Sequence, residues 1–354
     1  FLGVSMFNQA AVYKELVCKG MLPYLISDLS NVYYVSGFTG SAGFIVVDEN
    51  GFLFVTDPRY SRQIEIEISE DFERKIVSSY KEFLEELSSR YDKIYIDPGS
   101  KLETYITLSK KTKVVVDLAG TISLLRMFKS SLEVIEIKNA YKIASAAFMD
   151  LLKEVSFGET ENYWAGILEY NIKKHGGRSA SFDTIVASGF RGALPHGVAS
   201  GKIIRSDEPV VVDYGAKTTY CSDITRMVYS GDDEFVLKIM GLVNDAKMKA
   251  IESVKPGMEA CEVDSISRKY LESAGYGKYF NHGLGHGVGI DVHEKPSLNP
   301  RDHTIIEPGM VLTIEPGLYF GDKFGVRVED TILVNENGCE ILSSVLDKHF
   351  YKIR

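Results

Sequence analysis

Two stretches of the chain, about 100 residues apart, carry the same features in the same order. A valine, a glycine three positions later and a helical pattern occur at 155–158 and again at 254–257. A Glu-Pro pair before a strand-like run follows at 208–209 and again at 307–308, so that both offsets are 99 residues. A repeat of this length indicates two similar half-domains packed together, and the interface between such halves is a natural place for a functional site.

The part of the chain before the repeat has a different pattern. Short apolar runs that suit strands, such as 93–96 and 114–116, alternate with helical patterns over the first 120 residues or so, as in an α/β unit. With 354 residues, the chain is long enough for two domains of roughly 150 residues each. We therefore expect an α/β N-terminal domain at 1–122, a linker at 123–132 and an α+β domain at 133–354.

Three further segments have an expected local structure. Residues 133–155 carry an apolar stripe at helical spacing. The glycine-rich segment 37–43 is expected to be a turn between two strands, at 32–35 and 44–47, because it lacks the Lys-Ser/Thr pair and the following helix of a phosphate-binding loop. The Glu- and Lys-rich run 65–90 is interpreted as a solvated helical face.

Composition excludes several classes of protein. Forty basic and 49 acidic residues give a net charge of −9, and no basic block suggests nucleic-acid binding. No run of about 18 apolar residues predicts a transmembrane helix, and the first residues lack the pattern of a secretory signal. The four cysteines are widely spaced, as reduced thiols are. We expect a cytoplasmic protein with small substrates and neither a nucleic-acid nor a membrane partner.

Four carboxylates lie in or beside apolar strand-like runs of the repeat: Asp213, Asp223, Glu315 and Glu329. A carboxylate in such a run is costly to bury unless a positive charge pairs with it. The arginines nearest in sequence, Arg226 and Arg327, are too few to neutralise four carboxylates. Metal ions can do so, and the pattern therefore predicts a metal centre.

Four of the seven histidines lie in or near glycine-containing motifs, at His196, His282, His286 and His293. One imidazole together with four carboxylates is a hard, oxygen-rich donor set, which favours Mn²⁺, Fe²⁺ or Co²⁺ over a cysteine-bound structural zinc. Four carboxylates balance the charge of two divalent ions. Two such ions, about 3.5–4 Å apart, hold a bridging hydroxide and polarise a carbonyl group.

The order and spacing of these motifs resemble the proline-selective branch of the pita-bread metallopeptidases of family M24, which contains aminopeptidase P and prolidase. The segments that carry the resemblance are 213–226, 285–294, 313–319 and 325–330, together with 37–43 and 56–63 near the N-terminus. The resemblance implies a creatinase-like α/β N-terminal domain. It also implies an α+β pita-bread catalytic domain with an internal pseudo-two-fold repeat.

The resemblance also implies a role for each site residue. The metal ligands would be Asp213, Asp223, His286, Glu315 and Glu329. Glu315 would also shuttle a proton, His293 would stabilise the tetrahedral intermediate, and His196 would lie near the proline side of the substrate. His282 and Arg327 would orient other groups. The cofactors would be two divalent ions, Mn²⁺ or Co²⁺, with Zn²⁺ or Fe²⁺ as alternatives.

One spacing departs from the family pattern. Asp213 and Asp223 are ten residues apart, where the family usually has eleven. We expect the missing residue to fall in the turn at 217–219, where loop length is tolerant. If it fell within a strand, one carboxylate would face away from the other, because side chains alternate along a strand.

Several functions agree with these motifs. The main expectation is an Xaa-Pro aminopeptidase that acts as a homodimer on short peptides with proline at the second position, because 37–43 and 56–63 look more like aminopeptidase P. The alternative is an Xaa-Pro dipeptidase, or prolidase. Methionine aminopeptidase shares the ligands but typically lacks such an N-terminal domain. A non-catalytic peptide-binding relative would have lost ligands, whereas all five are present.

Overall fold

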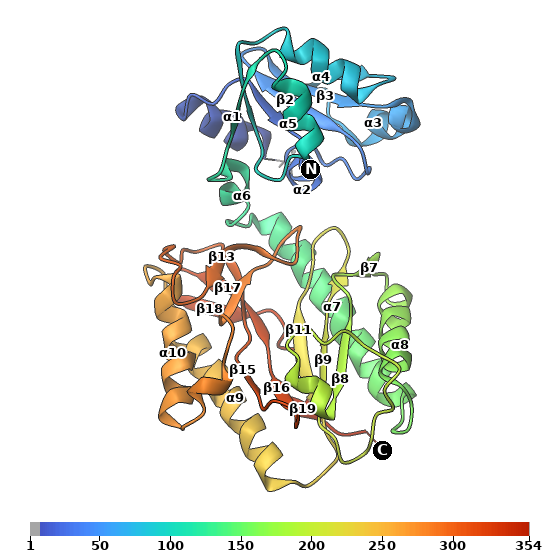
Figure 1. Ribbon diagram of the computed structural model, residues 1–354, viewed down its shortest axis with the longest axis vertical. Coiled ribbons are helices and arrows are strands. Elements are labelled where there is room, and N and C mark those ends of the chain that lie inside the picture. The colour runs from blue at the N-terminus through green and yellow to red at the C-terminus, as the bar shows by residue number, and fades with distance from the viewer. Residues whose placement is uncertain (1–7, 354) are drawn as a thin grey trace. The chain divides into compact units, whose positions relative to one another are not determined.

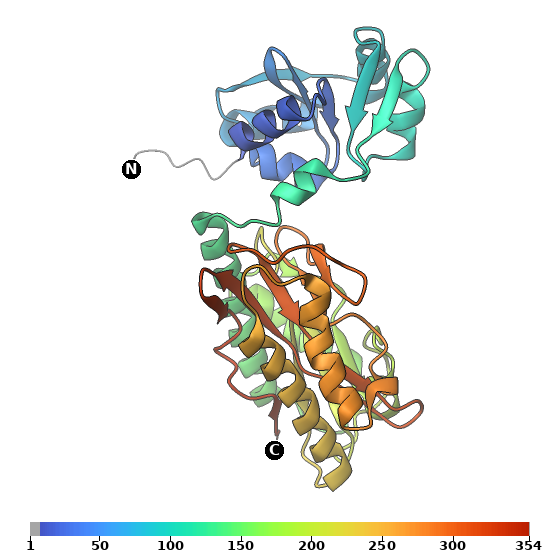
Figure 2. The same ribbon diagram turned by 90° about the vertical axis from the view of Figure 1, so that its left-hand side faces the viewer.

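The computed structural model describes residues 8–353. Residues 1–7, where the sequence shows no signal pattern, and residue 354 lie outside the described part. The chain divides into two compact units, with the boundary between Arg126 and Met127 (Figures 1 and 2). The segment 123–132, expected to be a linker, holds the end of one helix and the start of the next. Within residues 8–353, no helix has both the length and the apolar character needed to cross a membrane.

The N-terminal unit is built on one mixed six-stranded sheet. Its strands, in the order β4-β3-β2-β1-β5-β6, are Phe72–Ile76, Gly51–Thr56, Phe44–Asp48, Tyr24–Ile26, Lys93–Ile96 and Lys113–Val116. Strands β1, β2 and β3 pair antiparallel and the other pairs are parallel. The helices are α1 (Gln9–Cys18), α2 (Leu29–Ser36), η1 (Pro58–Tyr60), α3 (Ser61–Glu67), α4 (Tyr80–Ser88), α5 (Leu102–Leu108) and α6 (Thr121–Leu125).

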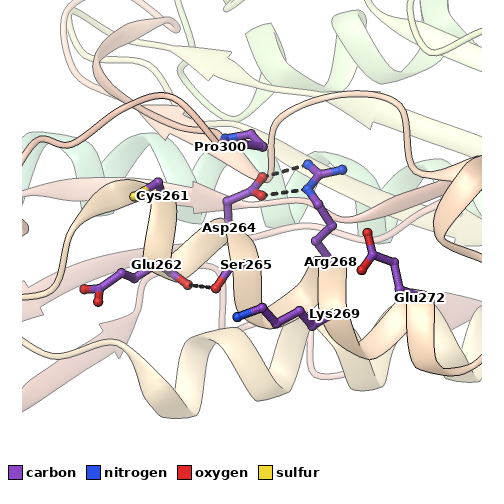
Figure 3. A pocket seen from close by; sticks show the side chains of 8 residues that line it. All are labelled: Cys261, Glu262, Asp264, Ser265, Arg268, Lys269, Glu272 and Pro300. Carbon is purple, nitrogen blue, oxygen red and sulfur yellow. Dashed lines mark hydrogen bonds and ion pairs between the residues drawn. The ribbon is translucent and has the colours of Figure 1, made fainter.

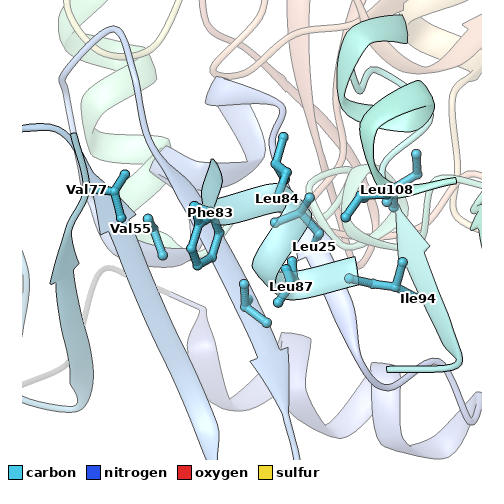
Figure 4. Packing of buried hydrophobic residues seen from close by; sticks show 10 residues of the cluster. Leu25, Val55, Val77, Phe83, Leu84, Leu87, Ile94 and Leu108 are labelled. Atoms are coloured by element: carbon cyan, nitrogen blue, oxygen red, sulfur yellow. The ribbon is translucent and has the colours of Figure 1, made fainter. Parts of the chain in front are cut away.

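Helices α4 and α5 cover one face of this sheet, where apolar side chains from strands and helices form a continuous core (Figure 4). Phe83, Leu84 and Leu87 of α4 pack there against Leu25 and Ile94 of neighbouring strands. These side chains are nearly or fully buried. Their removal from water is the main favourable term that holds the α/β unit together.

Two local expectations for this unit are wrong. Residues 32–35 belong to helix α2 rather than to a strand, although valine and tyrosine favour strands. The Asp28 side chain accepts the Asn31 N–H at 3.0 Å at the start of this helix, and Gly37 closes it with a φ of 77°. These two caps outweigh the strand propensity of the residues between them. Strand β4 also interrupts the expected helical face at 65–90.

The C-terminal unit contains two main sheets and two helix pairs. Its helices are α7 (Ser131–Glu154), α8 (Glu161–Lys174), η2 (Gly189–Ala193), α9 (Glu234–Ser253), α10 (Ala260–Ser273) and η3 (Gly277–Tyr279). One sheet, in the order β19-β11-β9-β8, is formed by Phe350–Tyr351, Ile224–Val228, Val210–Tyr214 and Ile185–Ser188. All strand pairs in the two main sheets are antiparallel except the parallel pair of β11 and β19. Strands β10 (Ala216–Lys217) and β7 (Ser179–Ala180) pair beside it.

The second sheet has the order β13-β12-β14-β17-β18. Its strands are Glu294–Leu298, Gly285–Gly287, Val311–Ile314, Asp330–Asn335 and Gly338–Ile341. A short hairpin of β15 (Gly317–Tyr319) and β16 (Gly325–Arg327) completes the unit. Helix α7 packs against α8, and α9 packs against α10, so that a helix pair accompanies each sheet (Figure 1).

The sequence repeat corresponds to matching backbone contacts in the two halves of this unit. The Gly158 N–H donates to the Ile204 carbonyl at 2.9 Å, and the Gly257 N–H donates to the Ile306 carbonyl at 2.8 Å. Each of these bonds ties the segment before a helix to the segment before a central strand. The unit is therefore the expected α+β pita-bread domain with an internal pseudo-two-fold repeat.

Candidate metal centre

Strands β9 and β11 bring two aspartates to one face of the first sheet. Asp213 lies opposite Thr225 in this antiparallel pair. Asp223 immediately precedes β11 and is two positions from Thr225, so it faces the same side. Carboxylate oxygens of Asp213, Asp223 and Glu329 lie within 4.8 Å of one another. Despite the ten-residue spacing, both aspartates therefore lie on one face of the sheet. This is the arrangement expected if the missing residue falls in the connecting turn rather than within a strand.

A histidine and a glutamate from the second sheet approach the same aspartate. His286 Nε2 lies 3.5 Å from Asp223 Oδ2 and 3.3 Å from Glu315 Oε1. His286 is in β12, and Glu315 follows the last residue of β14. Two groups of ligand atoms thus share Asp223. The five residues expected to bind metal lie together in the structure.

Glycines on both sides of His286 allow its strand to lie between two others. A Cβ atom at Gly285 would lie 2.0 Å from the Thr313 carbonyl oxygen, and one at Gly287 would lie 2.3 Å from the Lys295 carbonyl oxygen. Real Cβ contacts do not come this close, so no other residue fits either position without moving a strand. The Gly-His-Gly sequence is thus what brings the imidazole close to the carboxylates.

Arg327 connects several parts of this site. Its guanidinium donates to Asp213 Oδ2 at 2.6 Å, to the Tyr319 hydroxyl at 2.8 Å and to the Pro195 carbonyl at 3.0 Å. A longer bond of 3.3 Å runs from its Nε to Thr225 Oγ1. The side chain is almost fully buried. A planar, five-donor guanidinium can make these contacts at once, whereas a lysine ammonium cannot.

The other three histidines predicted to belong to the site, His282, His293 and His196, differ in how deeply they are buried around this centre. His282 Nε2 is 3.0 Å from the Tyr319 hydroxyl, which joins it to the Arg327 network. The His293 ring lies 4.3 Å from the His286 ring, centroid to centroid. Burial lowers the pKa of His293, and His286 acts in the same direction. His196 is exposed and directly follows Pro195, whose carbonyl accepts the bond from Arg327.

The carboxylates of the centre carry more negative charge than the protein neutralises. Burial, together with the neighbouring carboxylates, raises the pKa of Asp223 and of Glu329 well above the usual values. Burial also raises the pKa of Glu315, but its hydrogen bond with His286 and the charges of His286 and His282 outweigh that effect and bring the pKa to about 2. A further cation would stabilise all of these groups in their ionised form.

Arg226 does not provide that charge. It bonds instead to Asp330 Oδ1 at 2.6 Å and to backbone carbonyls, and Lys247 contacts the other oxygen of Asp330. Within residues 8–353, Asp213 Oδ1 and Glu329 Oε1 are buried and have no hydrogen-bond partner. Unpartnered buried oxygens are costly and rare. Both belong to the group of three carboxylates, so the residues present fit divalent metal ions.

Two threonines that support the ligands are absent from the sequence-based assignment. Thr225 Oγ1 donates to Glu329 Oε2 at 3.0 Å, and Thr313 Oγ1 donates to Glu315 Oε1 at 3.2 Å. Each threonine lies in a strand two positions from a carboxylate of the centre, Asp223 or Glu315. The period of two along a strand is the signal that could have found them, because it puts both side chains on one face.

Carboxylates and an imidazole that converge in this way are typical of a metal-dependent hydrolase. The chain belongs to metallopeptidase family M24, whose sequence profile matches residues 136–336. The profile of the Creatinase/Prolidase N-terminal domain matches residues 10–128. The protein is therefore a metallopeptidase, and the expectation of an M24 enzyme with a creatinase-like N-terminal domain is confirmed.

Individual relatives cover nearly the whole chain. An Xaa-Pro dipeptidase of Pyrococcus horikoshii is 40% identical over 328 residues, which are 90% of this chain and 92% of the relative. The crystal structure of the prolidase from Pyrococcus horikoshii is similar, with a TM-score of 0.89 and 36% sequence identity. The match covers 94% of this chain and 97% of the prolidase chain. The crystal structure of an X-Pro aminopeptidase from Thermotoga maritima gives a TM-score of 0.87 at 34% sequence identity. That match covers 96% of this chain and 100% of the aminopeptidase chain.

Proposed function

We propose that the chain is an Xaa-Pro dipeptidase that uses two divalent metal ions. The observation that carries this proposal is the pair of ligand groups that share Asp223, because it offers two adjacent cation positions. The relatives support the dipeptide as substrate: Xaa-Pro dipeptidases of two Pyrococcus species are 40% and 39% identical over 90% and 88% of this chain. The sequence alone favoured aminopeptidase P, which becomes the second candidate on the similarity to the Thermotoga maritima enzyme.

In this proposal Asp213, Asp223 and Glu329 would hold one ion, and His286 and Glu315, beside Asp223, would hold the other. Such ions, Mn²⁺ or Co²⁺ on this oxygen-rich donor set, supply an acidified water and polarise the scissile carbonyl group. The protein's other task is to hold the ligands in place. Arg327 and Thr225 do so through their bonds to Asp213 and Glu329.

Proton transfer is assigned to Glu315. The nitrogen of an Xaa-Pro bond carries no hydrogen, so a general acid has to protonate it as the bond breaks. Glu315 is largely buried beside His286, and its hydrogen bond with His286 lowers the pKa of the carboxyl group and so favours the ionised form, which can accept a proton. His293 and His196 are proposed to donate hydrogen bonds to the reacting carbonyl and to the proline side of the substrate, respectively.

The test is a paired assay on protein stripped of metal and reloaded with Mn²⁺ or Co²⁺. An Xaa-Pro dipeptide is compared with the same dipeptide extended by one or two residues, and with an Xaa-Ala dipeptide as the control for proline selectivity. A dipeptidase cleaves the free Xaa-Pro dipeptide fastest. Faster cleavage of the extended peptide would establish aminopeptidase P instead, and metal-dependent cleavage of neither would refute both functions.

Oligomeric state and the role of Glu315 are measured on the same preparation. The homodimer implied by the family resemblance remains a prediction, which light scattering after gel filtration tests. Glu315→Gln keeps the shape of the side chain but removes its ability to accept a proton. We expect this variant to stay folded and to lose turnover, and full activity in it would overturn the role given to Glu315.

A further inference from the structure

A second group of metal-binding side chains lies at the N-terminal end of α10. Cys261 Sγ is 3.3 Å from Glu259 Oε2 and 3.6 Å from His303 Nδ1, and His303 Nδ1 is 2.6 Å from Glu259 Oε2. Possible ligand atoms of one thiol, one imidazole and one carboxylate thus lie within 4.8 Å of one another. None of them belongs to the centre around Asp223.

The distances suit a tetrahedral ion. Metal–ligand bonds of about 2.0–2.3 Å at tetrahedral angles place ligand atoms roughly 3.3–3.7 Å apart. Both distances from the Cys261 sulfur already match. The short contact between His303 and Glu259 is a hydrogen bond and has to open by about 0.7 Å to reach the same geometry. Their side chains are 71% and 40% exposed, so they have room to do so.

The backbone already aligns the two segments that carry these side chains. The Cys261 N–H donates to the Asp302 carbonyl at 2.8 Å, and the Ala260 N–H donates to the Thr304 carbonyl at 2.9 Å. Glu259 forms a β-bridge with Ile305. An ion bound here therefore orders only side chains rather than loops, which keeps the entropic cost of binding small.

The surroundings favour a cation. Glu262 on α10 and Asp302 beside His303 add carboxylates to that of Glu259. The hydrogen bond with Glu259 raises the pKa of His303, which reflects this negative environment. Cys261 also lies at the edge of a surface cavity of about 400 Å³ that is lined along α10 by residues such as Ser265 (Figure 3).

The cluster is not a by-product of the repeat. Ninety-nine positions earlier, at the start of α8, the counterparts of Glu259 and Cys261 are Thr160 and Asn162. The Thr160 side chain caps that helix by accepting the Tyr163 N–H at 3.2 Å, which is an ordinary structural role. In the second half Glu259 takes the N-cap position and its backbone N–H donates to Glu262 Oε2 at 2.8 Å, while the thiol of Cys261 and the imidazole of His303 come to lie beside it.

We propose that Glu259, Cys261 and His303 form an accessory site for one divalent ion of the zinc class, with water as the fourth ligand. A thiolate and an imidazole select Zn²⁺ or Co²⁺ over the hard ions Mg²⁺ and Ca²⁺. The ion would bind in exchange for the thiol proton and the proton shared by His303 and Glu259. It would fasten the start of α10 to the segment that follows β13, the strand that pairs with the strand carrying His286.

Cobalt absorption tests this site without reference to activity. Co²⁺ bound by a thiolate gives an intense ligand-to-metal absorption in the near ultraviolet, which an oxygen- and nitrogen-liganded ion does not. Metal-free protein titrated with Co²⁺ should therefore develop this absorption, and Zn²⁺ should displace it. Cys261→Ser and His303→Ala should abolish it, with circular dichroism to verify that both variants are folded.

Two controls separate the accessory site from the proposed catalytic centre. Cys339→Ser removes another partly buried cysteine, one whose thiol donates to the Ile251 carbonyl at 3.4 Å, and should leave the absorption unchanged. Asp223→Asn damages the catalytic centre and should also leave it unchanged. Absence of the absorption in the wild-type protein, or its persistence in folded Cys261→Ser, would overturn the accessory site.

Discussion

The two halves of the catalytic unit share a fold but supply different side chains to the proposed metal centre. The first half provides Asp213 and Asp223, whereas the second provides a histidine and two glutamates. Each half also fixes a ligand of the other: Arg327 of the second half bonds Asp213, and Thr225 of the first half bonds Glu329. The repeat sets the backbone, and the exchange of hydrogen bonds between the halves arranges the ligands.

This difference explains where the unsatisfied atoms lie. Among the described residues, one buried carboxylate oxygen without a hydrogen-bond partner belongs to each half, Asp213 Oδ1 and Glu329 Oε1. Bonds across the interface satisfy the other oxygen of each carboxylate. The two unpartnered oxygens are therefore available to bind the divalent ions that the family implies. Because each half holds a carboxylate of the other, a substitution on either side of the interface should affect both halves.

The largest effect is expected from Asp223→Asn, because Asp223 belongs to both ligand groups. We expect turnover to fall below detection and the metal content measured by mass spectrometry to drop. A chelator should lower the melting temperature of the wild type, since an ion at 100 times its Kd stabilises by about 2.7 kcal/mol. It should hardly change that of the variant.

The control for this variant is Asp322→Asn, which alters an exposed carboxylate and should behave as the wild type. If Asp223→Asn retained both its metal and its activity, the shared position of Asp223 would have no functional meaning.

A smaller effect is expected from Arg327→Lys, which keeps the charge but loses the multiple donors. Because Asp213 and Thr225 would lose their shared partner, we expect kcat/KM to fall about 10–100-fold, as is typical when a group that orients a metal ligand is removed. Arg301→Lys, at an exposed position, is the matched control. Wild-type kinetics in Arg327→Lys would show that the interface bonds do not arrange the ligands.

The smallest effect is expected from Thr225→Val, which keeps the shape of the side chain and removes one hydroxyl. Loss of the bond to Glu329 should cost about 1 kcal/mol, or roughly a fivefold drop in kcat/KM at saturating metal. Thr225→Ser restores the hydroxyl and should recover most of the rate. A drop that serine does not rescue would assign the effect to packing rather than to the hydrogen bond.

The sequence predicted the parts of the molecule that depend on local patterns. The carboxylates at strand ends could be found because an acidic residue in an apolar run is unusual, and the repeat could be found from its constant offset. Helix α2 was missed because the propensity of its central residues hid the signals of Asp28 and Gly37 at its ends. Local pattern was the correct guide there too, once the caps are given more weight than the residues between them.

Contacts between distant residues could not be predicted in this way. Arg327 was expected to orient other groups, but the 114 positions that separate it from Asp213 leave no periodic signal of that pairing. The cluster at α10 was missed for the same reason, since Cys261 and His303 are 42 positions apart. Only the folded structure shows which arginine lies beside Asp213 and which cysteine lies beside a histidine and a carboxylate.

The exchange of bonds between the halves has a consequence for how the protein is made. A ribosome releases Asp213 and Asp223 long before it releases the segment with Glu329, so the nascent first half offers only two carboxylates to the metals of the cell. Two carboxylates alone are a weak and unselective trap. Under the proposed ligand assignment the complete donor set exists only after the second half has been synthesised and has docked, so binding of both ions would follow the synthesis of both halves.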